Sequence, residues 1–297
     1  MQKAGIVMDQ QTGKLYIVAT PIGNSRDMSP RGVQILSDVE IIAAEDTRRS
    51  MVLLNMLGVK NKLVSNHKFN EYGKAKYFVG EMLAGKSVAV ITDAGTPCIS
   101  DPGNELIRAA VEAGIPVIGV PGCCAAVTAL SVSGFDLSSF LFYGFFPREN
   151  AERRKLLEEL RRADTRTFAF YESPKRIMDL LDFLIEAEVG CRLCLCNDLT
   201  KLHERSSRGT PREVKTQLED KGSWDKGEYA LVMELEEAYR FRKAEHTVSA
   251  EAMLVDAMIA GGLSGKEAVA AVLADENNSY SKNELKAAAL NLKKLFA

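Results

Sequence analysis

The sequence ITDAGTPCISDPG, from Ile91 to Gly103, ends an apolar run that starts at Val88 and breaks it with glycine and proline. Two other stretches share this design: VATPIGN at Val18–Asn24 and VPGCCA at Val120–Ala125. Each would expose backbone amide and carbonyl groups in a turn that directly follows a strand. Parallel strands in an open α/β sheet deliver such turns to one edge, where the ligands of these folds bind. The sequence therefore predicts one pocket built from several loops.

Strands and helices alternate through the first half of the chain. Apolar runs of strand length lie at Leu15–Thr20, Glu40–Ala44, Leu63–Ser65, Val88–Thr92 and Val117–Val120. Helical patterns lie at Ser29–Ser37, Arg48–Leu57, Gly73–Ala84, Gly103–Ala113 and Cys123–Val132. This alternation is typical of βαβ units around a parallel sheet, so we expect residues 12–134 to form an N-terminal α/β domain.

The second half has fewer helices for its strands and predicts a mixed α/β domain at residues 135–238. The aromatic run Phe140–Phe146 and a polar, exposed helix at 148–162 mark its beginning. Strands are expected at Thr167–Tyr171, Arg192–Asn197, Glu204–Arg208 and Glu228–Glu236, with helices at Pro174–Ala187 and Pro211–Glu219. Helical patterns at Ser249–Ala260, Ser264–Ala274 and Lys282–Leu295 then predict a small C-terminal helical segment at 247–297.

Composition sets only broad limits on function. The chain has 297 residues, 46% apolar side chains and a net charge of −2. An RNA site would therefore have to be a local basic patch rather than a field of the whole protein. Residues Met1–Gln11 lack a signal-peptide pattern, and no apolar run has the length of a membrane span. We expect a cytoplasmic protein that does not associate with membranes.

Six cysteines are present, and three of them cluster as Cys191, Cys194 and Cys196. A reducing compartment would keep them as thiols. The cluster has strand periodicity, and no second Cys/His pair follows at a ligand spacing. Buried thiols are therefore favoured over a zinc site, and no metal ligand is assigned.

A phosphate-loop pattern, G-x-x-x-x-G-K-S, occurs at Gly80–Ser87. That motif works only between a preceding strand and a following helix, whereas here a helix precedes and a strand follows. The pattern therefore predicts a helix end at Gly85. The dinucleotide-binding motif G-x-G-x-x-G does not follow a strand anywhere in the sequence either. The three loops carry Asp93 and Asp101 but no Lys or Arg, so a cationic or neutral ligand is favoured over pyrophosphate. A sulfonium cofactor would fit, because its positive charge disappears on methyl transfer.

Several motifs in fixed order give the chain a family resemblance. They are Ala19–Asn24 (ATPIGN), Ala44–Arg48 (AEDTR), Asp93–Pro97 (DAGTP), Ser100–Gly103 (SDPG), Tyr171–Pro174 (YESP), Leu199–Glu204 (LTKLHE) and, in the tail, Ser281–Leu285 (SKNEL). Over about Gly13 to Glu236 the chain resembles the ribosomal small-subunit RNA 2′-O-methyltransferase I family, within the tetrapyrrole methylase superfamily. The resemblance implies a two-domain α/β, class III methyltransferase fold with a helical tail. It also implies S-adenosyl-L-methionine as cofactor, a homodimer, and as substrate the ribose of a cytidine in the decoding region of 16S rRNA.

By position, the resemblance also implies the residues of the cofactor cleft. They are Pro21, Gly23, Asp93, Gly95, Thr96, Pro97, Cys98, Pro121, Gly122, Cys123, Cys124, Ala125, Tyr171 and Ala230. The chain departs from the family in two places. Cys123-Cys124 replaces Pro-Ser, which removes an expected side-chain hydroxyl, and Asn197-Asp198 replaces Arg-Glu ahead of Leu199.

Catalytic candidates follow from the reaction that the resemblance implies. A ribose hydroxyl is a poor nucleophile, so a base or a cation that stabilises the developing alkoxide should help. Asp46 is the preferred group, with Glu45 second, although Asp46 could equally cap the helix near Arg48. Lys201 and His203 would share a face if their segment is extended. His203 could be a base, an RNA contact or structural, and Lys201 is expected to hold a phosphate or the alkoxide.

Four residues are predicted to bind the substrate: Arg48, Glu172, Lys175 and Arg176. Lys175 and Arg176 would contact phosphates at the mouth of the cleft. Arg148, Arg153, Arg154 and Lys155 either extend this patch or form a solvated helix face. Two alternatives to rRNA methylation stay open: methylation of another acceptor such as a tetrapyrrole, and an RNA-binding assembly protein that keeps the cofactor without turnover.

Overall fold

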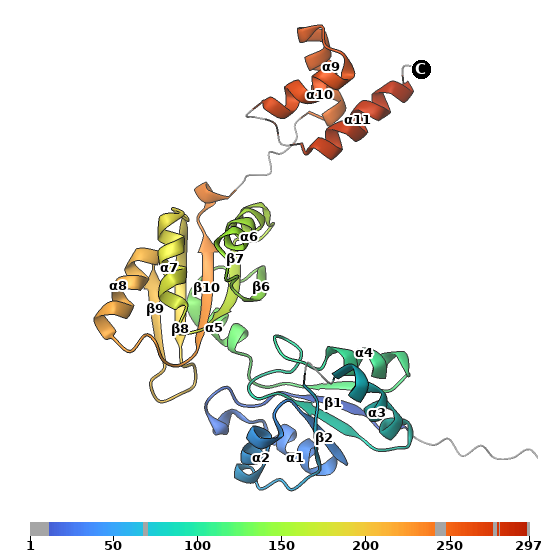
Figure 1. The fold of residues 1–297 in the computed structure, drawn as a ribbon, viewed down its shortest axis with the longest axis vertical. Coiled ribbons are helices and arrows are strands. Elements are labelled where there is room, and N and C mark those ends of the chain that lie inside the picture. The colour runs from blue at the N-terminus through green and yellow to red at the C-terminus, as the bar shows by residue number, and fades with distance from the viewer. Residues whose placement is uncertain (1–11, 68–70, 241–247, 276–277, 279, 296–297) are drawn as a thin grey trace, which may run out of the picture. The chain divides into compact units, whose positions relative to one another are not determined.

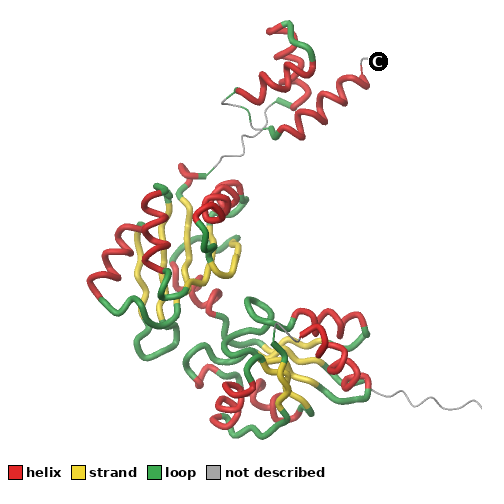
Figure 2. The backbone as a smooth tube through the Cα atoms, in the orientation of Figure 1, coloured by secondary structure: helices red, strands yellow, loops and turns green. Residues whose placement is uncertain are grey.

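The computed structural model describes residues 12–67, 71–240, 248–275, 278 and 280–295. The chain divides into a large compact unit that ends at Tyr239 and a small one from Arg240 onward. The large unit contains two separate five-stranded sheets, and helices make up the small unit (Figures 1 and 2). The finer division of the large unit at residues 134 and 135 stays a proposal.

The first sheet has the strand order β3-β2-β4-β1-β5, and every neighbouring pair is parallel. Its strands are β1 (Leu15–Val18), β2 (Ile41–Ala44), β3 (Leu63–Ser65), β4 (Val88–Ile91) and β5 (Val117–Val120). The helices that cover it are α1 (Pro30–Asp38), α2 (Thr47–Met56), α3 (Glu71–Leu83) and α4 (Asn104–Glu112), and a short 3-10 helix, η1, spans Ser25–Asp27. The predicted parallel sheet is confirmed.

Both faces of this sheet are buried, which is why its strands read as continuous apolar runs. On one face, Phe78 and Met82 of α3 and Leu106 of α4 pack on the sheet. On the other, Leu36 of α1 and Leu54 of α2 do the same. Figure 2 shows these two helical layers on either side of the strands. Since both faces are covered, the carboxyl edge, where the loops of interest lie, is the expected position for a ligand.

The second sheet has the order β6-β7-β10-β8-β9, in which β6 and β7 are parallel and the other pairs antiparallel. Its elements are β6 (Phe140–Phe145), α6 (Asn150–Arg162), β7 (Thr167–Glu172), α7 (Ile177–Glu186), β8 (Cys191–Asn197), β9 (Arg205–Gly209), α8 (Pro211–Lys221) and β10 (Tyr229–Leu235), followed by the short η2 (Glu237–Tyr239). The mixed α/β character is confirmed. The aromatic run that marked the boundary forms the edge strand β6.

Helix α5 (Ala125–Ser133) covers the second sheet, not the first. Its Ala129 and Leu130 pack with Ala169, Ala230 and Val232. The βαβ order of the sequence predicted the opposite, and that prediction was wrong because a helix of small and apolar residues can cover either sheet. As a result, the loop before α5 belongs to the first sheet while the helix itself is fixed on the second.

Two local expectations in the second half are also corrected. The helix predicted to be exposed at 148–162 buries one face, with Leu156, Leu157 and Leu160 in the core beneath α7. Arg153 on that face is 1% exposed, so it cannot extend a surface patch. The helix expected from Pro174 starts at Ile177, because Pro174–Arg176 forms a turn.

The C-terminal unit contains α9 (Ala250–Gly261), α10 (Gly265–Ala274) and α11 (Lys282–Leu295) around Leu254, Val269 and Leu285. Ser249 caps α9, and Ser264 with Glu267 forms a capping box on α10. Among the described residues, no single helix is long and apolar enough to cross a membrane. The pair α9 and α10 passes that test of length and composition only when taken together, bent by 103°.

Candidate functional site

The three Gly/Pro loops of the first sheet are bonded to one another. Thr20 and Gly95 exchange backbone hydrogen bonds of 2.9 and 3.0 Å, which join the first loop to the second. The Thr96 hydroxyl donates to the Cys123 carbonyl at 2.8 Å, which joins the second to the third. Gly95 has φ +84°, a conformation that glycine adopts without strain. The loops therefore form one continuous wall.

The second sheet closes the site through the turn after β8. Backbone N–H of Asn24 donates to the Thr200 hydroxyl at 3.1 Å. A Cβ on Gly23 would lie 2.5 Å from Lys201 Cγ, so the turn approaches the first loop too closely for a side chain there. Lys201 Nζ is itself held by Asp198 and Glu228, each at 2.8 Å. Glycine at this position lets the two halves of the site meet.

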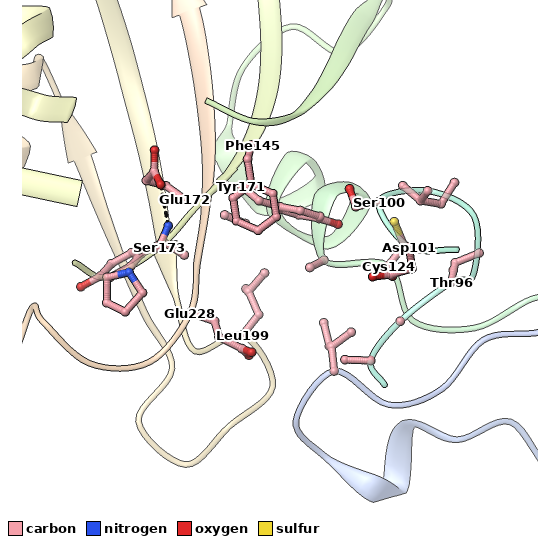
Figure 3. A pocket seen from close by; sticks show the side chains of 18 residues that line it. Thr96, Ser100, Asp101, Cys124, Phe145, Tyr171, Glu172, Ser173, Leu199 and Glu228 are labelled. Carbon is pink, nitrogen blue, oxygen red and sulfur yellow. Dashed lines mark hydrogen bonds between the residues drawn. The ribbon is translucent and has the colours of Figure 1, made fainter. Parts of the chain in front are cut away.

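Between these walls lies a cavity of about 330 Å³, shown in Figure 3. Its volume falls in the range of small-molecule sites, about 300–1,000 Å³. The lining residues are Ile22, Ala94, Gly95, Thr96, Ile99, Ser100, Asp101, Cys124, Ala125, Phe145, Tyr171, Glu172, Ser173, Pro174, Leu199, Glu228, Tyr229 and Ala230. Among these described residues there are carboxyl groups but no Lys, Arg or His.

The predicted cofactor residues divide into two groups. Gly95, Thr96, Cys124, Ala125, Tyr171 and Ala230 line the cavity. Pro21, Gly23, Asp93, Pro97, Cys98, Pro121, Gly122 and Cys123 lie in the same loops but outside its lining. Several of this second group shape the loops: a Cβ on Gly122 would lie 2.8 Å from Ala19 Cβ, so this loop also needs glycine to pass. Their roles as cofactor ligands stay predictions.

Tyr171 links the two sheets at the cavity. Its ring lines the cavity beside Phe145, with ring centroids 5.9 Å apart, and its hydroxyl accepts a hydrogen bond from Ala126 N at 3.2 Å. Ala126 lies in the first turn of α5, where backbone N–H groups lack helical partners. Burial raises the pKa of Tyr171 to about 12, so the phenol stays protonated.

An acidic cluster lies at the carboxyl edge of the first sheet. Asp101 lines the cavity, and behind it the Thr92 hydroxyl donates to Glu45 Oε2 at 2.6 Å. Asp93 accepts from Asp46 N and pairs with Arg49 at 2.9 Å. Burial and the charge of Glu45 raise the pKa values of both Asp93 and Asp101. A cationic ligand bound at this end of the cavity would relieve the repulsion between these carboxyl groups.

Asp46, the preferred catalytic group, is placed as a helix cap. Its carboxylate accepts from Arg48 N at 2.9 Å and pairs with the Arg48 guanidinium at 2.9 Å. The hydrogen bonds from Arg48 lower the pKa of Asp46 to about 2. Asp46 is also absent from the cavity lining. Of the two roles considered for it, the geometry favours the cap, while its catalytic role stays a prediction.

Lys201 and His203 do not share a face of an extended segment, because residues 198–203 form consecutive turns. Lys201 N bonds to Asp198 O, Glu204 N bonds to Lys201 O, and Thr200 has φ +68°. The segment is therefore not extended, and the condition under which Lys201 and His203 would share a face is not met. Lys201 supports the wall of the cavity, and His203 is exposed outside its lining. Their catalytic roles stay untested.

The predicted substrate-binding residues have different surroundings. Arg48 is exposed and paired with Asp46. Glu172 is buried and pairs with Arg176 at 2.8 Å, and Arg176 also donates to the carbonyl of Phe146 at 2.5 Å. Arg176 thus holds the loop after β6 to the turn after β7. Lys175 is exposed beside Pro174 of the cavity, where a phosphate could reach it.

The structure decides how the phosphate-loop pattern and the cysteine cluster are interpreted. Gly80 lies inside α3, Gly85 has φ +91° just beyond its end, and Ser87 precedes β4, as the helix-end interpretation predicts. Cys191, Cys194 and Cys196 are buried free thiols on β8, as predicted. Among the described residues, no group of three or more His, Cys, Asp or Glu side chains could hold a metal ion.

Comparison with known proteins identifies the family. A family model described as Tetrapyrrole (Corrin/Porphyrin) Methylases matches residues 14–215. The chain is 42% identical to the ribosomal RNA small subunit methyltransferase I of Halalkalibacterium halodurans over 227 residues, 75% of this chain and 76% of that one. It is 39% identical to the Haemophilus influenzae protein of the same name over 282 residues, 94% of this chain and 96% of that one. The chain belongs to this methyltransferase I family, within the tetrapyrrole methylases.

Solved structures agree with this family fold. Uroporphyrin-III-C-methyltransferase from Thermus thermophilus superposes with a TM-score of 0.52 over 75% of this chain and 94% of that one, at 21% identity. A second structure of a Thermus thermophilus Uroporphyrin-III C-methyl transferase, complexed with S-adenyl homocysteine, gives 0.50 over 74% and 97% at 16% identity. At these identities the likeness shows the fold alone, and it confirms the predicted class III methyltransferase architecture.

For this member of the family, sequence reasoning missed several cavity residues. Ser100, Asp101, Ile99 and Ser173 sit inside motifs that the sequence analysis quoted, so proximity to the Gly/Pro turns could have identified them. No sequence pattern near Phe145 or Glu228 indicated that these residues would line the cavity. They reach the cavity because β6 ends and β10 begins beside it in the second sheet.

Proposed function

We propose that this methyltransferase transfers the methyl group of S-adenosyl-L-methionine to the ribose 2′-hydroxyl of a cytidine in the decoding region of 16S rRNA. The observation that carries the proposal is the cavity: the described residues that line it include carboxyl groups but no basic side chain. The chain that forms this cavity is 39% identical over 282 residues to a ribosomal RNA small subunit methyltransferase I. A cavity of this charge suits a sulfonium and repels phosphate.

The described cavity residues fit the cofactor by their chemistry. Asp101 places a carboxyl group at the space, whereas Glu228 is paired with Lys201, and the Gly95 and Ala230 segments bring backbone groups to the cavity wall. Tyr171 and Phe145 offer aromatic surface for a planar base. When bound, the cofactor supplies an electrophilic methyl group. The chain's own part is to hold the acceptor oxygen in line with that group, which alone can give a large rate acceleration.

The RNA backbone must lie outside the acidic cavity, because phosphate groups and carboxylates repel. Lys175, exposed beside the lining residue Pro174, is the proposed phosphate contact at the mouth. Such a contact sets the position of the RNA without reading its sequence. We propose a homodimer as the working form, and either the small ribosomal subunit or naked 16S rRNA as the substrate.

The test incubates the purified protein and methyl-labelled S-adenosyl-L-methionine with small ribosomal subunits and, separately, with naked 16S rRNA. Nuclease digestion and mass spectrometry then locate the label. One 2′-O-methylated cytidine in the decoding region is the expected product, and the substrate that is labelled shows which form is used. Cofactor binding without any RNA label would contradict the proposal. Label on a tetrapyrrole instead would support the other chemistry of the superfamily, and salt-dependent RNA binding without turnover would support an assembly protein.

A further inference from the structure

A basic surface lies at one edge of the first sheet, along helix α3 and the segment that leads into the edge strand β3 (Figure 1). Four lysines and two tyrosines form this lysine–tyrosine surface: Lys60, Lys62, Tyr72, Lys74, Lys76 and Tyr77. Among the residues that the structure describes, none of the four lysines forms an ion pair. In a chain whose net charge is −2, this surface is the kind of local basic patch that RNA binding would need.

Contacts at Tyr77 bring the two parts of the surface together. Lys62, directly before β3, donates from Nζ to the Tyr77 hydroxyl at 3.4 Å. Lys74 Nζ lies 5.6 Å from the centroid of the same ring. Lys76 follows Tyr72 by four residues, so these two side chains share a face of α3. Two ammonium groups are thus held beside one ring, where an anion such as a phosphate would offset their mutual repulsion.

The two acidic residues of α3 are engaged elsewhere. Glu71 is buried, and its carboxylate accepts hydrogen bonds from Gly103 N at 2.7 Å and from Glu105 N at 2.8 Å. Glu81 pairs with Lys86, beyond the end of the helix. The Glu71 bonds also fix the start of α3 to the loop between β4 and α4, and this loop lines the cavity. The lysine–tyrosine surface therefore begins beside a wall of the cavity.

The arginines considered for substrate binding are less available. Arg48 pairs with Asp46, and Arg176 pairs with Glu172. Arg153 is buried. A phosphate would have to compete with a carboxylate for each of the two paired arginines, whereas the lysines of the lysine–tyrosine surface carry no such cost.

Lysines at a sheet edge have a second possible explanation, because they also prevent the edge strands of two molecules from pairing. That role does not account for Tyr72, which lies on a helix and is 86% exposed. Exposed aromatic rings among basic side chains are typical of proteins that bind RNA, where the rings stack on unpaired bases. The combination of lysines and tyrosine favours RNA over a purely protective edge.

We infer that the lysine–tyrosine surface binds the RNA substrate beside the cavity, with its lysines on phosphates and Tyr72 stacked on an unpaired base. The inference rests on the proposed function, because it names how the RNA of that site is held. Lysine contacts to phosphates set the position of the RNA without reading its sequence. From Tyr72 to Tyr77 the axis of α3 rises by about 8 Å. Since phosphates of one strand are about 3.4 Å apart along a nucleic-acid helix, the surface spans about two or three nucleotides.

The first experiment measures how salt affects the binding of naked 16S rRNA by the full-length protein. The test variant is Lys62→Gln/Lys74→Gln. The control, Lys215→Gln/Lys221→Gln, removes the same charge from α8, where Lys215 pairs with Asp182. Each lysine on a phosphate contributes about 0.7–0.9 to the slope of log affinity against log salt concentration.

We therefore expect the test variant to reduce this slope by about 1.4–1.8 and to bind the rRNA about 20- to 60-fold more weakly than wild type at about 0.1 M salt. The control variant should keep the slope and affinity of wild type. Equal slopes in the test and control variants would overturn the inference.

The second experiment separates stacking from charge at Tyr72. We expect Tyr72→Ala to weaken binding of the rRNA by about 5- to 150-fold. The salt slope should stay unchanged, because a stacked ring releases no counterions. Tyr72→Phe keeps the ring and should bind as wild type does. Wild-type affinity in Tyr72→Ala, or an equal loss in Tyr72→Phe, would overturn the stacking assignment.

Methylation assays distinguish a failure of this inference from a failure of the proposed function. In Lys62→Gln/Lys74→Gln the KM for RNA should rise, while the dissociation constant for S-adenosylmethionine should match wild type. If the wild type methylates RNA and this variant has an unchanged KM, the inference fails and the proposed function stands. If the wild type methylates no RNA but the variant loses RNA affinity as expected, the proposed function fails and the RNA-binding surface stands. Binding of phosphatidylserine vesicles that the variant loses, with its RNA affinity unchanged, would assign the lysines to a lipid surface and overturn the inference.

Discussion

Asp46 and Asp101 are carboxyl groups on the same edge of the first sheet, and their surroundings move their pKa values in opposite directions. Asp46 accepts hydrogen bonds from Arg48 at the start of α2, which lowers its pKa to about 2. Asp101 is half-buried beside Glu45 and Asp93, which raises its pKa. A group that stays ionised suits a cap, whereas a half-buried group beside other carboxylates holds its proton more readily. Local partners, not residue type, separate the two pKa values.

The Asp46 cap predicts a pH-dependent stability. In the folded state its pKa is about 2, below the ordinary value of about 3.9 in an unfolded chain. The carboxylate therefore stabilises the fold above about pH 4, and this contribution is lost as the pH falls towards 2. Asp46→Asn keeps a capping oxygen but removes the charge. We expect the difference in free energy of unfolding between wild type and Asp46→Asn, measured with urea, to shrink from pH 5 to pH 2. A constant difference over that range would contradict the assignment, and full kcat in Asp46→Asn would remove Asp46 from catalysis.

At the scale of elements, the site depends on loops that pass close to each other at glycine residues, where no side chain keeps them apart. The first loop meets the Thr200–Lys201 turn at Gly23, and the third passes Ala19 at Gly122. Both approaches join strands from distant parts of the sequence. The helices behind these loops supply their anchors, since α5 is fixed on the second sheet while the loop before it belongs to the first.

Gly23→Ala and Gly80→Ala form a matched pair of substitutions. The new methyl group at residue 23 would meet Lys201 Cγ at 2.5 Å, and Lys201 is held by two carboxylates. We expect a loss of about 1–3 kcal/mol in the free energy of unfolding, typical of overpacking, and weaker cofactor binding. At residue 80, inside α3, no atom lies within 4 Å of the new group, so alanine should add about 0.5–1 kcal/mol. Thermal unfolding and calorimetry measure both. Lost cofactor affinity in Gly80→Ala would revive the phosphate-loop interpretation.

Replacing the cysteine at the N-cap of α5 with serine should stabilise the start of this helix. Cys124 is the N-cap of this helix and makes no side-chain capping bond. A serine hydroxyl there can accept from Val127 N, since Ala126 N is already bonded to Tyr171. We expect Cys124→Ser to raise the free energy of unfolding by about 1 kcal/mol. Cys123→Ser, one residue before the cap, is the control and should give a smaller change. Equal effects at both positions, measured by urea unfolding, would contradict the capping argument.

At the scale of the whole molecule, an apolar edge of the second sheet lies open. Strand β6 is an edge strand, and its Phe140, Leu141, Tyr143 and Phe145 are each at least 38% exposed. Proteins usually cover or charge such edges, because unpaired strand groups and apolar side chains invite association. This edge is therefore the proposed contact of the homodimer.

Leu141→Glu tests that contact. A charge on the β6 edge should convert the proposed homodimer to a monomer at micromolar concentration, because a buried, unpaired carboxylate is costly. Val111→Glu on α4, which is 61% exposed in wild type, is the control and should stay dimeric. Light scattering after size exclusion gives the mass of each variant. A monomeric wild type would contradict the homodimer proposal, and a dimeric Leu141→Glu variant would show that the contact lies on another surface.

The elements themselves were largely predictable from local patterns. The strands Leu63–Ser65 and Val117–Val120 and the helix Lys282–Leu295 occur with the predicted bounds. Apolar runs between helical patterns define a parallel sheet, and the Gly/Pro turns after them define its ligand edge. The family motifs lie in those same turns, so fold, family and the general position of the site could be derived without coordinates.

Which side chains face the cavity was decided by tertiary structure. Phe145 and Glu228 reach it from the second sheet, Arg153 turns inward to Asp179 at 2.6 Å, and Asp46 is occupied by its own helix. The sequence by itself determined where strands end and which residues can turn there, because turns and strands depend on neighbours along the chain. The tertiary structure alone decided that α5 covers the second sheet and that the Thr92 hydroxyl bonds to Glu45. Packing and charge act between residues that are close in space and distant in sequence.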